Sequence, residues 1–203
     1  MVRPRLLVCS LALTMSACAT EDPLDPGLLE RIARRVGDAN GTALSGVYPM
    51  PATTPARCDC AELDVSVLEF LFDAAPDTAT CSNLAAWIFL KQIRLEVKQY
   101  DGFMLGTDDV PGGILLFSDA RLRLSGPVDS NESAELASVI NLSGDELQLR
   151  ARANLTFEAK EGAPTAASGF LRSRVISRVP GGKIDCRIDF DLEGVAEIEE
   201  TGP

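Results

Sequence analysis

The stretch that decides the fold is LRSRVISRVPGGKIDCRIDFDL, residues 171–192. Polar and apolar residues alternate on both sides of its Pro-Gly-Gly centre, a pattern typical of two antiparallel strands joined by a tight turn. A two-residue turn at Gly181-Gly182 sets arginines of the first strand opposite aspartates of the second. The pairs predicted by this register are Arg178 with Asp185, Arg174 with Asp189, and Arg172 with Asp191.

The same register gathers apolar side chains on the other face of the hairpin. A slip by one residue would mix the two faces, so the pattern predicts one buried face and one charged face in water. A solvated ladder of ion pairs contributes little per pair and is not a catalytic site. The expected apolar set is Leu171, Val175, Val179, Ile184, Ile188, Phe190 and Leu192, with Cys186 on the same face.

Stretches with the same alternation, separated by glycine-bearing turns, fill most of the chain before this hairpin. This arrangement is typical of an antiparallel meander. A first strand is also expected at residues 44–50. The other expected strands cover residues 92–99, 103–106, 114–124, 134–142, 146–157, 168–179 and 183–198.

The turn at Tyr100-Asp101-Gly102 allows two registers. A two-residue Asp-Gly loop faces Val97 with Gly106, whereas a three-residue loop faces Val97 with Leu105. We expect the three-residue loop because it collects more apolar residues on one face. Those residues are Ile93, Leu95, Val97, Phe103 and Leu105.

Two segments indicate short helices. Residues 63–74 carry apolar residues at helical spacing, whereas residues 83–91 suit a helix or a buried strand equally well. We therefore predict a mainly β protein, an antiparallel meander of about seven or eight strands with one or two short helices. It forms either an up-and-down barrel or a strongly curved sheet, in one domain over residues 44–203.

The N-terminus has the order of an export signal. Arg3 and Arg5 precede the apolar stretch LLVCSLALTM at residues 6–15, which is too short to span a membrane as a helix. Met15-Ser16-Ala17-Cys18 follows. This tetrapeptide resembles the lipobox of bacterial lipoproteins, in which small residues precede a cysteine. The resemblance covers residues 1–18 alone and does not extend to the rest of the chain.

The resemblance implies that residues 1–17 are a signal peptide, that the chain is cut after Ala17, and that Cys18 is acylated. The protein would then lie in the bacterial cell envelope, held in the membrane by its lipid; Ala19 after the cysteine favours the outer membrane. The alternative is ordinary cleavage near Ala17 or Ala19 without a lipid. Residues 18–43 would be a lipidated tether, with a short helix at 28–36 capped by Asp25.

Four cysteines remain after such processing: Cys58, Cys60, Cys81 and Cys186. Export into an oxidising compartment favours two disulfides. A Cys58–Cys60 bridge would close a very small ring, so one of these two should bond Cys81 and the other Cys186. A zinc site built from all four is the alternative, although the C-x-C spacing fits it poorly.

The composition limits the functions open to the chain. With 30 acidic and 19 basic residues, the net charge is −11, which disfavours nucleic acid as a partner. The absence of histidine excludes a Ser-His-Asp triad and any histidine-ligated metal. We identify no catalytic residue, cofactor or metal site. We expect a non-catalytic protein that binds a protein partner or a small amphiphile; the alternative is a hydrolase using two carboxylates.

Arginines recur at strand spacing in three pairs, Arg121/Arg123, Arg150/Arg152 and Arg172/Arg174. Neighbouring strands would bring them onto one face. Such a face is either an anion site or, as we expect, a solvated surface on which arginines pair with acids.

Overall fold

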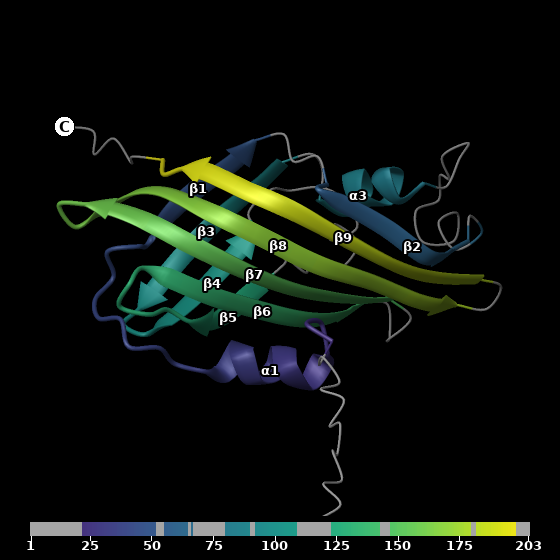
Figure 1. Cartoon of the computed structure of the whole chain (residues 1–203), viewed down its shortest axis with the longest axis horizontal. Helices are drawn as coiled ribbons and strands as arrows, with labels where there is room; N and C mark the ends of the chain where they lie inside the picture. Colours follow the sequence, from purple (N-terminus) through teal and green to yellow (C-terminus); the bar gives the residue numbers. More distant parts are fainter. Residues whose placement is uncertain are drawn as a thin grey trace, which may run out of the picture.

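One antiparallel β-sheet forms most of the protein (Figure 1). The computed structural model describes residues 22–51, 55–64, 66, 80–89, 92–108, 123–142, 147–179 and 182–197. The mainly β class is confirmed, and the nine strands among these described residues exceed the expected number. The strands are β1 (Gly46–Pro51), β2 (Arg57–Leu63), β3 (Gln92–Tyr100), β4 (Phe103–Asp108), β5 (Arg123–Pro127), β6 (Ser133–Leu142), β7 (Leu147–Lys160), β8 (Ala163–Val179) and β9 (Gly182–Val195). The helices are α1 (Pro26–Arg34) and α3 (Cys81–Phe89).

The sheet is strongly curved but does not close into a barrel. Its strand order is β1-β3-β4-β5-β6-β7-β8-β9-β2, so the meander from β3 to β9 follows the chain and β2 joins the far edge. Figure 1 shows β1 and β3 behind β8 and β9. The curvature brings β1 back to the end of β9. One isolated bridge joins Val47 of β1 to Glu197, where the Glu197 N–H donates to the Val47 carbonyl at 2.8 Å. Of the two predicted architectures, the curved sheet is therefore the one observed.

The inner face of the sheet, defined here as the face that carries the main core, is filled by apolar side chains. Along β7 the burial alternates strictly over most of the strand, as expected for a sheet with one buried face. Tyr48 and Phe157 meet edge to face, with ring centres 5.3 Å apart. The Tyr48 hydroxyl donates to the Leu44 carbonyl at 2.8 Å, and burial raises the pKa of this phenol. Helix α3 adds Leu84 and Ala85 to the same core.

Helix α1 lies on the opposite face, here called the outer face (Figure 1). The Asp25 carboxylate caps it by accepting from the Leu28 N–H at 3.0 Å, and Pro26 occupies the first turn. Leu29 and Ile32 are buried against Ala137 of β6. The helix expected at residues 28–36 is thus present, and it packs on the sheet through its apolar side.

The last hairpin keeps its predicted faces but not its predicted register. Val179 lies opposite Gly182 and Arg178 opposite Lys183, so Arg172 faces Asp189 and Arg174 faces Arg187. The register with a Gly181-Gly182 turn is therefore wrong by two residues. A shift by two returns every side chain to its own face, because the period of a strand is two, so the apolar pattern does not distinguish these registers.

The register at Asp101-Gly102 was also predicted wrongly. Tyr100 pairs with Phe103 and Val97 with Gly106, which is the two-residue loop. Met104 is therefore fully buried, whereas Phe103 and Leu105 are only half-buried. The inner face here carries a buried amide: Gln99 accepts from the Leu44 N–H at 3.0 Å and donates to the Asp101 carbonyl at 3.1 Å. These hydrogen bonds offset the burial of a polar group.

Other segments complete the comparison with the expected elements. Strand β2 was not predicted, and the ambiguous segment 83–91 lies mostly within helix α3. The expected helix at 63–74 and the first part of the expected strand at 114–124 lie almost wholly outside the described residues. Within the described part of the chain, no helix is long and apolar enough to cross a membrane.

Candidate functional site

The cysteines that remain after the expected processing form two disulfides. Cys58 bonds Cys81, and Cys60 bonds Cys186, so the structure selects one of the two pairings left open by the sequence. Cys60 and Cys186 are direct cross-strand partners on β2 and β9. Sulfurs of Cys60, Cys81 and Cys186 lie within 4.8 Å of one another because the two bridges adjoin. A disulfide sulfur is not the thiolate that zinc binds.

Several of the recurring arginines come together on the outer face. Arg150 of β7 lies opposite Arg174 of β8, which in turn lies opposite Arg187 of β9. In the next row, Arg152 lies opposite Arg172. The predicted shared face therefore exists on β7 and β8, and Arg187 extends it beyond the predicted pairs.

The remaining pair, Arg121 and Arg123, lies apart from this group in the sequence. Arg123 is exposed at the start of β5, on the other side of β6 from β7. Arg121 lies outside the described residues.

Acidic residues pair with Arg174 and Arg187 of this group. Arg174 binds Asp185 through two hydrogen bonds of 2.7 Å and reaches Asp22 at 3.2 Å. Asp22 also lies 3.4 Å from Arg187. These contacts agree with the expected surface of arginine–acid pairs, although the partners differ from the predicted ones because the register differs.

Acid should weaken the protein through Asp185. The hydrogen bonds from Arg174 hold the pKa of Asp185 below its ordinary value of 3.8. A carboxyl whose pKa is lower in the folded state stabilises that state above the unfolded pKa, and this stability is lost as the pH falls through the folded pKa. We expect Asp185→Asn to reduce the loss of unfolding free energy below pH 3.8, as measured by guanidinium titrations between pH 5 and pH 2.

Asp189 provides a matched control on the same strand. Burial raises the pKa of Asp189 above 3.8, so its protonation favours the folded state as the pH falls. Asp189→Asn should therefore steepen the acid loss that Asp185→Asn reduces. Identical acid profiles for the two variants would contradict this assignment.

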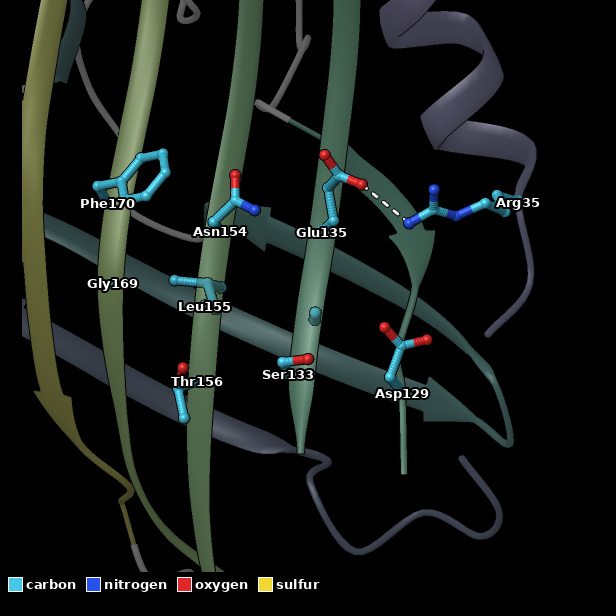
Figure 2. A pocket seen from close by; sticks show the side chains of 10 residues that line it. Arg35, Asp129, Ser133, Glu135, Asn154, Leu155, Thr156, Gly169 and Phe170 are labelled. Carbon is cyan, nitrogen blue, oxygen red and sulfur yellow. Dashed lines mark hydrogen bonds and ion pairs between the residues drawn. The ribbon is translucent and has the colours of Figure 1, made fainter. Parts of the chain in front are cut away.

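A groove lies on the outer face where α1 ends beside the sheet, and we call it the outer-face groove (Figure 2). It has a volume of about 470 Å³. Glu135 and Asn154 are direct cross-strand neighbours, as are Asn154 and Phe170, so one row of the sheet crosses the groove. The lining residues are Arg35, Asp129, Ser133, Ala134, Glu135, Asn154, Leu155, Thr156, Gly169 and Phe170.

Two arginines hold the central carboxylate of the groove. Glu135 accepts from Arg35 at 2.9 Å and also from Arg152, and its side chain is 17% exposed (Figure 2). Arg35 follows the last turn of α1, so the helix places this guanidinium over the sheet. The Glu135 carboxylate is thus fixed in orientation by charge-assisted hydrogen bonds from both sides.

The floor of the groove depends on a glycine. Gly169 has φ 153°, and a side chain there would place its Cβ 1.9 Å from the Asn154 carbonyl oxygen. Only glycine allows the two strands to approach so closely with this backbone. The groove therefore follows from both register and chain geometry, neither of which the sequence pattern specified.

The groove was not among the sites predicted from the sequence, and the predicted Cys18 lies outside the described residues. The alternation of β6, β7 and β8 assigned outer positions to Glu135, Asn154 and Phe170, but did not bring them into one row. No protein-family model, curated protein or solved structure matches this chain.

Proposed function

We propose that this protein is a bacterial envelope lipoprotein, anchored in the membrane through acylated Cys18, whose β-domain binds a partner or ligand and does not catalyse. The basic start, the short apolar stretch and the Met15–Cys18 tetrapeptide support the anchor. The inner face is filled by side chains, which supports the outer face as the binding surface. An amphiphile held within a barrel would need space where Tyr48, Met50 and Phe157 are at most 1% exposed.

We therefore assign binding to the outer face. The filled inner face is the observation on which this proposal depends. The carboxylates there offer little to a hydrolase. Glu135 and Asp185 each accept hydrogen bonds from arginines, so their oxygens are already engaged within the protein. Two carboxylates, Glu135 and Asp129, line the outer-face groove, but Arg35 and Arg152 hold the Glu135 carboxylate in ion pairs.

The position of Asp22 indicates how close the domain would lie to its anchor. Asp22 is ion-paired with Arg174 and Arg187 on the outer face. Only four peptide steps separate it from Cys18, and such a segment spans at most about 15 Å. An acylated Cys18 would therefore hold the outer face near the membrane, and the flexible tether would be much shorter than residues 18–43.

Replacing the lipid-bearing cysteine tests the anchor. We expect Cys18→Ala to accumulate as uncleaved precursor or to leave the membrane fraction, because the acyl chains on Cys18 would retain the mature protein. Fractionation and mass spectrometry of the N-terminal peptide measure the outcome. Cys9→Ala, in the apolar part of the signal, is the matched control and should be processed normally. A mature peptide with an unmodified Cys18 thiol would refute the anchor.

A further inference from the structure

An aromatic ring borders the outer-face groove. Phe170 is only partly buried, and the Arg172 guanidinium carbon lies 4.7 Å from its ring centre. Phe170 lines the groove, in the same row of the sheet as Asn154 (Figure 2). A partly exposed aromatic ring at this position offers apolar carbon atoms to a ligand in the groove.

Polar groups beside this ring remain available for a ligand. The side chains of Asn154, Thr156 and Asp129 make no hydrogen bond to other residues that the structure describes, and all three line the groove. An amide and a hydroxyl each donate and accept, and a carboxylate accepts. A ligand rich in hydroxyl groups matches this set, because each hydroxyl also donates and accepts.

The charges of the groove favour an uncharged ligand. Two cations, Arg35 and Arg152, stand beside two anions, Glu135 and Asp129. An anionic ligand would compete with Glu135 for Arg35 and would lie beside the Asp129 carboxylate, and a cationic one would meet the Arg35 guanidinium. A neutral ligand leaves these ion pairs intact and avoids the cost of separating them.

From the ring, the free polar groups and the balanced charge, we infer that the outer-face groove binds a neutral saccharide. One face of a sugar ring carries C–H groups that pack on an aromatic ring, while its hydroxyls bond to amide and carboxylate groups. The volume of about 470 Å³ lies within the range of small-ligand sites, enough for roughly one or two sugar rings. This inference rests on the proposed binding function and names its ligand class.

The test measures saccharide binding to the full mature protein in a zwitterionic detergent that contains no sugar. The probes are glucose, galactose, mannose, N-acetylglucosamine, cellobiose and chitobiose. Saturation-transfer NMR and titration measure the binding of each probe. We expect saturable binding of at least one probe, and a loss of affinity of tenfold or more in Phe170→Ala. Asn154→Ala should weaken binding several-fold, and Phe170→Tyr, which keeps the ring, should retain it.

Tyr100→Ala is the matched control, since this aromatic side chain is 58% exposed and does not line the groove. It should bind as the unchanged protein does, and the thermal unfolding of each variant shows whether it is folded. Absence of saturable binding by every probe would overturn the inference, as would binding that Phe170→Ala leaves unchanged. Tighter binding of glucuronate or inorganic phosphate than of glucose would also overturn it, in favour of an anion site.

The outcomes of the saccharide test and the anchor test are independent of each other. Lipidation of Cys18 without saccharide binding would refute the ligand class alone. Saccharide binding by a protein with an unmodified Cys18 thiol would refute the anchor alone.

Discussion

Replacing Cys60 and Cys186 with alanine should lower the unfolding free energy by about 5 kcal/mol, because their disulfide closes the longer of the two loops. Cys60 and Cys186 are 126 residues apart in the sequence, against 23 for Cys58 and Cys81. The chain-entropy relation gives about 3.5 kcal/mol for the shorter loop. The bridge also holds the edge strand β2 to β9, where Cys186 is fully buried.

Guanidinium unfolding of the two double-alanine variants, without reductant, measures this difference. The Cys58→Ala/Cys81→Ala variant is the control, since it loses the same chemical bond from a shorter loop. Equal losses, or a larger loss for the control, would contradict the loop argument. Thiol labelling of the unfolded, unreduced protein should meanwhile find no free thiol among these four cysteines.

Phe190→Ala should lower the unfolding free energy by about 3–5 kcal/mol, the range for removing a buried aromatic ring. Phe190 is 1% exposed and lies opposite Leu171, which is 2% exposed, on the inner face of the last hairpin. Removal of the ring would leave a cavity beside β8 and β9. Each of these strands is paired with a strand on both sides, so neither can move far to fill the cavity.

Arg172→Ala is the matched control, on the outer face of the same hairpin. Its side chain is exposed, so we expect a loss below about 1 kcal/mol. Denaturant titration of both variants measures the two effects. A loss for Arg172→Ala that equals or exceeds the loss for Phe190→Ala would mean that the inner and outer faces are assigned wrongly.

The alternation of residue types predicted the faces of this sheet but not its pairings. Val175, Ile188 and Phe190 are buried as expected, because each side chain of a strand points to the face opposite its neighbours. The register of the last hairpin was missed because a shift by two residues preserves that alternation. At Gln99, hydrogen bonds from a distant loop made a polar residue acceptable on the inner face.

The candidate site depends on contacts between distant parts of the chain. Arg35 and Glu135 are 100 residues apart in the sequence, and their ion pair exists because α1 packs on β6. Strand β2 was missed because its alternation of charged residues and cysteines covers only Arg57 to Cys60 before the register shifts, and its partner β9 follows more than 100 residues later.

By itself, the sequence determined the mainly β class, the buried and exposed faces of the long strands, and the capped helix α1. These depend on local periodicity and capping, which can be recognised from a few neighbouring residues. The tertiary structure decided the registers, the open curved sheet, the pairing of the cysteines and the outer-face groove. Each of these depends on which distant segments of the chain meet. Several registers and pairings share the same local sequence pattern, and the packing of the whole sheet decides among them.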